Sequence, residues 1–399
     1  MKTKVAVFFG GRSTEHEISV ISANQAMAAI DKEKYEVIPI YISKQGHWYT
    51  GELLTDVKNY RDIPSLLKQS TEVYMRPVYG DFNLYKANAG LFSSKAPVAT
   101  IDVAIPVLHG SNGEDGTFEG VLETIGLPFA GCNTLASANG MDKITMKMIL
   151  AADGIPVVDY VWFTDKQWFT KRDKFLTDIE TRLGYPVVVK PANLGSSVGI
   201  GRADNRDQLL ERVADAERYS TRIIVEKMVE NLQEINCAVL GDADEYITSV
   251  LEEPIKSGEI LSYTDKYMGG TKDNRGMHAA KKRIPADLPA DETERIRFLA
   301  GETFRVLGCH GVSRVDVMVD GKTRDIYVNE INTIPGSLSF YLWEAAGIRF
   351  DELMDRLVRL AFKRQRDMAA KTVSYDQNIF ALGGGTKGGV KGGVKGGIK

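Results

Sequence analysis

The chain has 399 residues, of which 43% are hydrophobic and 26% are charged, and its formal net charge is −3 at pH 7. A chain of this length exceeds what one hydrophobic core usually serves, so we expect two or three domains. The mildly acidic balance argues against nucleic acid as the main partner. No apolar run approaches the roughly 20 residues that span a bilayer, and no signal-peptide pattern opens the chain. We therefore expect a cytoplasmic protein with no membrane partner.

Cysteine and histidine usage excludes two common kinds of site. Cys132, Cys237 and Cys309 are odd in number and lack C-x-x-C spacing, which predicts neither a disulfide framework nor a zinc site. The five histidines are scattered, and no two have the spacing of metal ligands. We expect three buried or unreactive thiols.

The first part of the chain alternates strand and helix patterns, as in the opening of a doubly wound α/β domain. The predicted elements are a strand over 4–9, a helix over 18–30, a strand over 35–42 and a strand over 101–108. Gly10 and Gly11 follow the first strand at its carboxyl end, where such sheets bind ligands, so we expect a substrate site there. Residues 46–96 are less regular, and we interpret them as an excursion before the strand over 101–108.

Two further units follow a break at Ile155-Pro156. Their predicted helices are 142–152, 207–218 and 351–364, and their predicted strands are 157–163, 186–190, 233–240, 314–319 and 325–330. Residues 223–229 are expected to lead into the last unit. We therefore expect domains over 1–140, 141–222 and 223–375.

The end of the chain differs in composition from the rest. Residues 383–399 repeat Lys-Gly-Gly-Val and contain little that could be buried, so the entropy of ordering them is not offset. We expect a disordered tail. Weak attraction to an acidic surface is the functional alternative.

A set of oxygen-bearing side chains in the last unit predicts a metal site. Asp316 lies on one predicted strand, and Glu330 and Asn332 lie on the next at i and i+2, which places both on the same face. Hard oxygen ligands of this kind suit Mg²⁺ held against phosphates, and Arg314 nearby suits charge stabilisation. Taken alone, such a pair more often marks a solvated strand edge, so the company of other motifs decides.

That company is a predicted phosphate-binding segment upstream. Lys190 ends an apolar strand, and a Gly/Ser turn over 193–199 offers backbone N–H groups and hydroxyls to phosphate oxygens. The turn is not a Walker loop, because G-x-x-x-x-G-K-[ST] does not occur. Together the two segments indicate an enzyme that uses ATP.

With these motifs in order, the chain resembles the D-alanine–D-alanine ligase family of the ATP-grasp superfamily. The resemblance runs from about residue 5 to about residue 360 and rests on the opening 5–19, on Leu108-His109-Gly110, on 113–116 and on 141–143. It implies three α/β domains with ATP held between the second and third. It also implies formation of D-alanyl-D-alanine through a D-alanyl phosphate for peptidoglycan precursors, two Mg²⁺ (or Mn²⁺) ions per site, and a homodimer.

The resemblance implies a role for each matched residue. Those expected to bind ATP are Lys143, Lys190, Ser197, Glu226, Glu234 and Lys266, and those expected to bind metal are Asp316, Glu330 and Asn332. Those expected at the first amino acid are Glu15 for its ammonium group, His109 on its carboxylate side, and Ser196 and Tyr267, whose hydroxyls link with Glu15. Those expected at the tetrahedral intermediate and the second carboxylate are Arg314, the N–H of Gly336, Ser337 and Leu338.

Two departures from the family pattern concern the second substrate. The segment after Gly336 is shorter than usual by several residues, and the loop over 268–284 is longer, so a lid there would close differently. Tyr267 is typical of the ligases that accept D-alanine, which favours a dipeptide product. The alternatives are a ligase using D-serine, D-lactate or another acceptor, and a nucleotide-binding protein without turnover.

Overall fold

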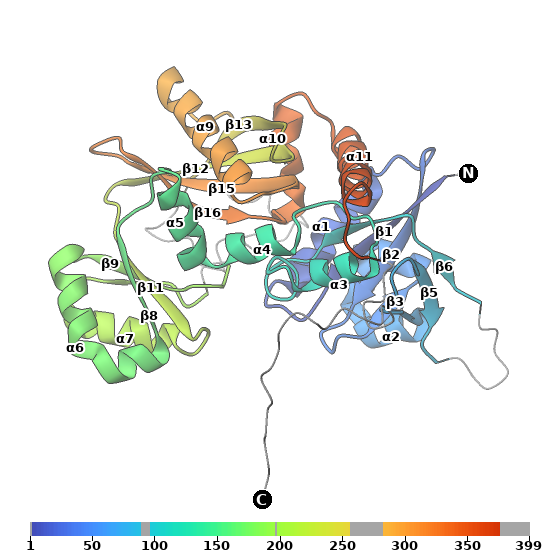
Figure 1. Ribbon diagram of the computed structural model, residues 1–399, viewed down its shortest axis with the longest axis horizontal. Coiled ribbons are helices and arrows are strands. Elements are labelled where there is room, and N and C mark those ends of the chain that lie inside the picture. Colours follow the sequence, from blue (N-terminus) through green and yellow to red (C-terminus); the bar gives the residue numbers. More distant parts are fainter. Residues whose placement is uncertain (1, 89–95, 196–197, 256–281, 376–399) are drawn as a thin grey trace, which may run out of the picture.

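Among the residues that the structure describes, the strands form three sheets with helices around them (Figure 1). The computed structural model describes residues 2–88, 96–195, 198–255 and 282–375. Four predicted site residues, Ser196, Ser197, Lys266 and Tyr267, lie outside the described residues, as do the predicted tail and most of the loop over 268–284.

The N-terminal sheet is built on three parallel strands, β1 (Thr3–Gly10), β2 (Tyr35–Ile42) and β7 (Val103–Val107). The apolar run of β1 is fully buried from Val5 to Phe9, as expected for a central parallel strand covered on both faces. Helix α1 (His16–Ala29) connects β1 to β2 and packs against β1. The predicted doubly wound opening is confirmed.

The segment 46–96, which we interpreted as an excursion before the strand over 101–108, contains strands that extend the same sheet, and these strands were not predicted. The added strands pair antiparallel with one another in the order β6-β5-β4-β3-β2. They are β3 (Trp48–Thr50), β4 (Thr71–Met75), β5 (Asn83–Lys86) and β6 (Ala99–Thr100), with η1 (Glu52–Thr55), η2 (Val57–Asp62) and α2 (Ile63–Gln69) between β3 and β4. Strands this short are too brief to establish a clear period-two pattern.

A smaller four-stranded sheet follows, in the order β10-β9-β11-β8. Its strands are β8 (Tyr160–Thr164), β9 (Val187–Pro191), β10 (Gly201–Ala203) and β11 (Arg222–Lys227). The helices of this part of the chain are α3 (Thr117–Ile125), α4 (Thr134–Met141), α5 (Lys143–Ala152), α6 (Asp165–Arg182) and α7 (Arg206–Ala216). Strand β11 pairs with β8 and β9, so the segment expected to lead into the last unit is hydrogen-bonded into this sheet.

The C-terminal sheet has the order β14-β13-β12-β15-β16. Its strands are β12 (Leu232–Gly241), β13 (Tyr246–Pro254), β14 (Lys282–Arg283), β15 (Gly311–Asp320) and β16 (Ile326–Asn332). The remaining elements are α9 (Ala290–Val306), the short turn η3 (Gly336–Ser339), α10 (Phe340–Ala345) and α11 (Phe350–Ala369). The predicted strands over 233–240, 314–319 and 325–330 are confirmed within one to three residues at their ends.

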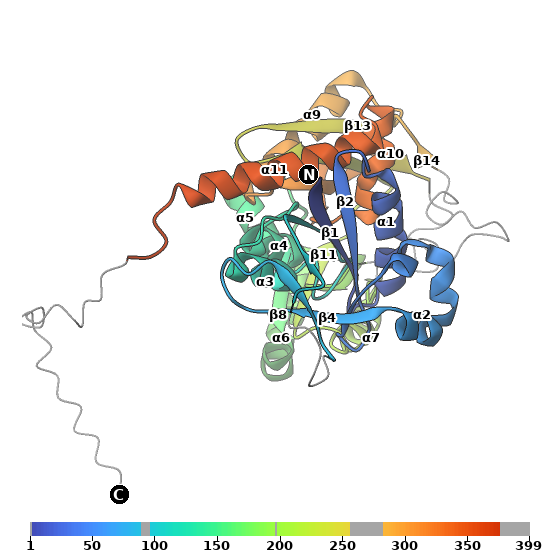
Figure 2. The same ribbon diagram turned by 90° about the vertical axis from the view of Figure 1, so that its right-hand side faces the viewer.

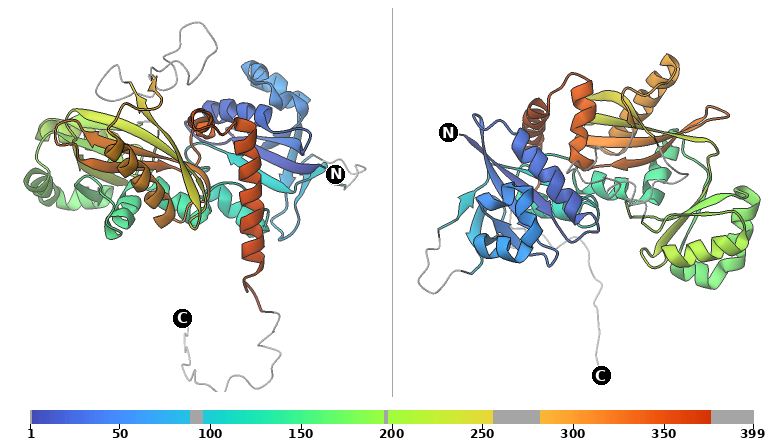
Figure 3. Two further views of the ribbon diagram at one scale, coloured as in Figure 1. Left: turned by 90° about the horizontal axis from the view of Figure 1, so that it is seen from above. Right: turned by 180° about the vertical axis from the view of Figure 1, so that it is seen from behind.

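Helix α11, near the end of the described chain, packs against the N-terminal domain. Helix α11 lies beside the N-terminal sheet and α1, which is visible from two further directions (Figures 2 and 3). One hydrophobic core contains side chains of β1, α1 and β7 together with Leu353, Leu357 and Ala361 of α11. The apolar spacing that predicted this helix therefore marks the face that is buried against the N-terminal domain.

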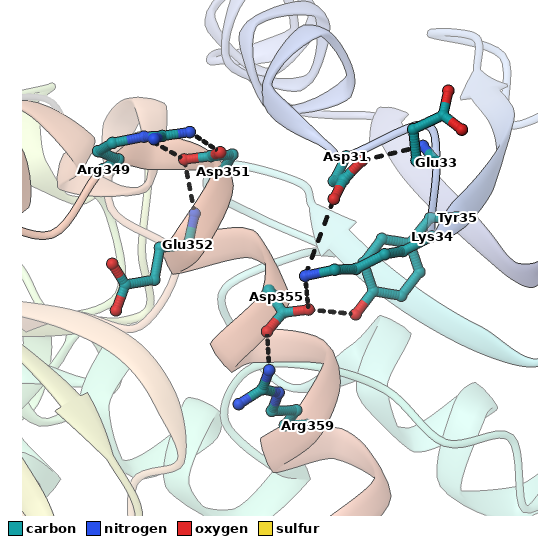
Figure 4. Close-up of polar contacts among 9 residues, drawn as sticks. All are labelled: Asp31, Glu33, Lys34, Tyr35, Arg349, Asp351, Glu352, Asp355 and Arg359. Atoms are coloured by element: carbon teal, nitrogen blue, oxygen red, sulfur yellow. Dashed lines mark hydrogen bonds and ion pairs between the residues drawn. The ribbon is translucent and has the colours of Figure 1, made fainter.

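A polar network closes the same contact (Figure 4). The buried carboxylate of Asp355 on α11 accepts a hydrogen bond from the Tyr35 hydroxyl at 2.7 Å, and it also pairs with Lys34 at 3.4 Å and with Arg359 at 2.6 Å. A buried charge is tolerated when it is paired and hydrogen-bonded in this way. The network fixes α11 against the start of β2.

Candidate active site

The predicted metal ligands meet across two neighbouring strands. Asp316 on β15 is the Cα partner of Glu330 on β16, and Arg314 is the partner of Asn332. Arg314 donates two hydrogen bonds to the carboxylate of Asp316, at 2.6 and 2.7 Å, and the Asn332 amide donates to the same carboxylate at 3.1 Å. The structure therefore brings Arg314, Asp316, Glu330 and Asn332 into one cluster.

The donor set of this cluster fits a divalent cation that is also held by phosphates. Two carboxylates and an amide supply hard oxygen atoms, which Mg²⁺ and Mn²⁺ prefer, and too few of them to enclose an ion without a substrate. Within the described ranges no group of three or more His, Cys, Asp or Glu side chains is arranged for a metal.

Two lysines from the neighbouring domain face this cluster. Lys143, at the start of α5, pairs with Glu330 at 3.0 Å and donates to the carbonyl of Leu194 at 2.8 Å. Burial by itself would lower the pKa of Lys143, but the pairing with Glu330 outweighs it and the pKa is raised. The ammonium group is therefore charged at neutral pH.

Lys190 reaches the same strand through a bulge. The pairing of β15 with β16 shifts register after Asp316, which leaves Asn329 as an extra residue. The Asn329 side-chain oxygen accepts a hydrogen bond from Lys190 at 3.1 Å. The bulge turns Asn329 and Glu330 toward the two lysines, and strand β16 is thereby fixed against the part of the chain that carries these lysines.

The predicted nucleotide-binding acid Glu226 is buried between two lysines. Its carboxylate pairs with Lys190 at 2.7 Å and with Lys147 at 3.2 Å. Burial would raise the pKa of Glu226, but these two cations outweigh it and lower the pKa to about 2. Lys147, which is fully buried on α5, was not predicted as a site residue. Its position four residues after Lys143, on the same helix face, was the available signal.

The remaining described nucleotide-binding candidate is Glu234. It lies half-buried on β12, opposite Met318 of β15, one strand away from the strand pair that carries the cluster. Its place on the same sheet agrees with a role near the nucleotide.

Glu15 lies where the loops of two domains meet. It directly precedes α1 and is buried. A Cβ atom on Gly195 would lie 2.9 Å from a Glu15 carboxylate oxygen, and a Cβ atom on Gly110 would lie 3.6 Å from it. Glycine at both positions therefore permits the close approach of the two loops to this carboxylate.

A second buried carboxyl group, Glu114, lies close to Glu15 and was not assigned a role from the sequence. It accepts hydrogen bonds from the N–H groups of Gly110 at 2.8 Å and Ile334 at 3.4 Å. Burial, reinforced by the negative charge of Glu15, raises the pKa of Glu114 to about 8. The sequence signal was available in the segment 113–116, which carries the family resemblance.

His109 is held by hydrogen bonds at both ring nitrogens. Nδ1 donates to the carbonyl of Ile334 at 2.9 Å, and Nε2 lies 2.9 Å from the hydroxyl of Ser22. Burial lowers the pKa of His109 to about 4, so the ring is neutral near pH 7 and Nε2 accepts the hydroxyl hydrogen. His109 therefore supports the segment that begins at Ile334.

That segment contains an unusual turn directly after Gly336. Ser337, Leu338 and Ser339 are consecutive residues in the left-handed region, with φ of 51°, 52° and 51°. Each such residue costs about 1–2 kcal/mol when it carries a Cβ atom. Burial of Leu338 and the hydrogen bond from the Ser337 N–H to Ser22 at 3.0 Å contribute to offsetting this strain.

A further polar set lies beside Arg314. The Tyr341 hydroxyl and the Asn236 amide both donate to Glu252, at 3.0 and 3.1 Å. The ammonium group of Lys282 lies 3.5 Å from the centre of the Tyr341 ring. These residues border the cluster on the side of α10, and sequence analysis did not single them out.

Two lysines and an arginine lie beside a pair of carboxylates where two α/β units meet. This arrangement is typical of enzymes that transfer a phosphoryl group. Sequence profiles described as "D-ala D-ala ligase N-terminus" and "D-ala D-ala ligase C-terminus" match residues 4–132 and 149–359. The D-alanine–D-alanine ligase of Thermosipho melanesiensis is 39% identical, covering 96% of this chain and 99% of the relative. That of Caldicellulosiruptor bescii is 43% identical, covering 94% and 99%. The chain belongs to the D-alanine–D-alanine ligase family.

Solved structures agree with this family. The D-alanine–D-alanine ligase of Coxiella burnetii superposes with a TM-score of 0.75 at 30% identity, covering 92% of this chain and 96% of that one. The VanG D-Ala:D-Ser ligase of Enterococcus faecalis gives 0.77 at 32% identity, covering 90% and 100%. A Bacillus anthracis D-alanine–D-alanine ligase complexed with ATP gives 0.63 at 26% identity, covering 92% and 99%. The predicted ATP-grasp architecture is confirmed.

Proposed function

We propose that the chain joins two molecules of D-alanine at the expense of ATP, through a D-alanyl phosphate, and so supplies D-alanyl-D-alanine for peptidoglycan precursors. The observation that carries this proposal is the cluster of Arg314, Asp316 and Glu330 facing Lys143 and Lys190. Use of ATP agrees with the cytoplasmic location expected from the sequence, and among the described residues no helix is long and apolar enough to cross a membrane.

In the first step, the carboxylate of one D-alanine attacks the γ-phosphorus of ATP, and ADP leaves. Lys143 and Lys190 stabilise the charge on the phosphate oxygens, and we propose Ser197, Lys266, Glu226 and Glu234 as further nucleotide contacts. Two Mg²⁺ or Mn²⁺ ions held by Asp316, Glu330 and Asn332 would supply charge neutralisation between the phosphates. Glu15, with Ser196 and Tyr267, would hold the ammonium group of the first D-alanine.

In the second step, the amine of the second D-alanine attacks the acyl carbon, and phosphate leaves from the tetrahedral intermediate. We propose that Arg314 and the N–H of Gly336 donate to the developing oxyanion. Burial would lower the pKa of Arg314, but its pairing with Asp316 outweighs this and raises the pKa, so the guanidinium stays charged. Ser337 and Leu338 would contact the carboxylate of the second substrate.

The domain division and the assembly remain part of the proposal. We propose domains over 1–140, 141–222 and 223–375, with ATP bound between the second and the third; β11, which begins at this second boundary, is hydrogen-bonded into the four-stranded sheet. A homodimer is expected by analogy with the family. Light scattering at several protein concentrations distinguishes a dimer from a monomer.

A different second substrate is the alternative function. The short turn after Gly336 and the similarity to a D-Ala:D-Ser ligase favour testing D-serine and D-lactate as acceptors. The test is ADP release and product mass with ATP, Mg²⁺ and D-alanine, alone and with each acceptor. D-alanyl-D-alanine as the main product supports the proposal, and ADP release only with another acceptor transfers the chemistry to that substrate.

A further inference from the structure

The hydroxyl of Ser22 links two parts of the site that lie far apart in the sequence. It accepts the N–H of Ser337 at 3.0 Å and donates to Nε2 of His109 at 2.9 Å. His109 in turn donates to the carbonyl of Ile334 at 2.9 Å. The residues Ser22 and His109 therefore hold both ends of the segment Ile334–Ser337, with Gly336 inside it.

The helix that carries Ser22 is itself fixed. Ser19, one turn earlier on α1, accepts the N–H of Gly10 at 2.7 Å and donates to the carbonyl of Val107 at 2.5 Å. These bonds tie α1 to the carboxyl ends of β1 and β7. Ser22 is fully buried, so its hydroxyl cannot exchange these protein partners for bulk water.

The segment it holds needs such support. Three left-handed residues follow Gly336, and a strained backbone of this kind persists only where its surroundings determine it. The Gly336 peptide is one residue before this turn. A small rotation of that peptide would redirect its N–H group away from a developing oxyanion, which lowers the rate without weakening nucleotide binding.

We propose that Ser22 is a positioning residue for amide-bond formation, which acts through His109 and Ser337 to aim the Gly336 N–H and to keep the strained turn in its active conformation. This inference rests on the proposed ligase function. It assigns to Ser22 an effect on the second chemical step and none on ATP binding.

The test compares Ser22→Ala and Ser22→Cys with the wild-type enzyme. Cysteine keeps the volume but bonds weakly, so it should behave like alanine and remains informative if the alanine variant folds poorly. The control is Ser137→Ala, a fully buried serine whose hydroxyl has no hydrogen-bond partner among the described residues. We expect kcat to fall about 10–100-fold in both Ser22 variants, with the KM for ATP within about two-fold and the control unchanged.

A second readout separates positioning from a loss of folded protein. This readout is the affinity for an inhibitor, a D-alanyl-D-alanine analogue with a tetrahedral phosphinate in place of the peptide carbonyl. The number of folded sites is measured separately, from the stoichiometry of ATP binding. Because the analogue resembles the intermediate, its affinity should fall by about the same factor as kcat/KM for the second D-alanine. Combining Ser22→Ala with His109→Ala should cost less than the sum of the two changes, since both release one segment.

The outcomes are distinct. If the wild-type enzyme forms the dipeptide and the Ser22 variants have an unchanged kcat, the inference is overturned and the proposed function stands. A lower kcat per folded site with unchanged analogue affinity also overturns it, because Gly336 would then be correctly aimed. Absence of dipeptide from the wild-type enzyme would overturn the proposed function and this inference together.

Discussion

The charged residues of the site are buried in matched sets. Glu226 is 2% exposed and lies between Lys147 and Lys190, and these two cations keep its carboxylate charged at a depth where an unpaired ion would cost several kcal/mol. Motif resemblance predicted Lys190 and Glu226. Lys147 was missed because a lysine on an amphipathic helix normally marks a solvated face, and only tertiary packing shows that this one is enclosed.

At the scale of residues, the proposed metal site of Asp316, Glu330 and Asn332 can be tested by removing one negative charge. We expect Glu330→Gln to reduce turnover at least about 100-fold, because it removes a proposed metal ligand and the partner of Lys143 at 3.0 Å. The measurement is ADP release across a Mg²⁺ titration, with the exposed Glu294→Gln as control. Activity near the wild-type level would show that the metal is held elsewhere.

A second residue-scale prediction concerns pH. Glu119 on α3 is buried, and Oε2 has no hydrogen-bond partner among the described residues. Burial raises its pKa to about 8. The folded protein therefore holds a proton that the unfolded chain releases above about pH 4.5, so the stability this group contributes is lost as the pH rises to about 8.

Glu119→Gln is neutral at every pH and should remove that part of the pH dependence. We expect the Tm of the variant to rise relative to wild type between pH 6 and pH 8.5, by about several degrees. Thermal unfolding at both pH values measures it. A Tm difference that stays constant across this window would contradict the raised pKa.

At the scale of elements, long periodic segments were predictable and short or strained ones were not. The strand predicted from the apolar run of β1 and the helix predicted from the apolar spacing of α11 agree with the structure. Each pattern is long enough to distinguish a strand from a helix. The strands β3 to β6 were missed because each is two to five residues long. Nothing in Ser-Leu-Ser indicates three left-handed residues, since that conformation is imposed by packing against α1.

In the strained turn after Gly336 we expect a glycine substitution to be more stable than an alanine substitution, which is the reverse of the usual order. At Ser339, φ is +51° and the hydroxyl has no hydrogen-bond partner among the described residues. Glycine avoids the left-handed penalty, so Ser339→Gly should be more stable than Ser339→Ala by about 0.5–1 kcal/mol. The same pair at Thr303, inside helix α9, should show the opposite order by about 1 kcal/mol.

Urea unfolding measures both pairs under the same conditions. If alanine is the more stable substitution at both positions, the left-handed turn does not exist in solution. Retained activity is not required for this test, because it compares free energies of unfolding only.

At the scale of the whole molecule, the ends of the chain form one core. Helix α11 packs on α1 and β7, so the N-terminal and C-terminal parts of the described chain share buried surface. The sequence predicted the apolar face of this helix but not its partner, because contacts between residues more than 300 positions apart leave no local pattern.

The polar part of this contact can be weakened without creating a cavity. Tyr35→Phe removes the 2.7 Å hydrogen bond to Asp355 and leaves the carboxylate paired with Arg359. We expect the free energy of unfolding to fall by about 1–2 kcal/mol. Tyr74→Phe, on an exposed strand position, is the control; equal effects of the two changes would show that the network does not stabilise the interface.

The most direct test of the central claim follows oxygen atoms through the reaction. With D-alanine labelled by ¹⁸O in its carboxylate, an acyl phosphate intermediate carries one labelled oxygen to phosphorus, and attack by the second amine releases it with the phosphate. Mass spectrometry should therefore find D-alanyl-D-alanine and one ¹⁸O in each inorganic phosphate formed. Dipeptide accompanied by unlabelled phosphate, or ATP cleavage without dipeptide, would contradict the account.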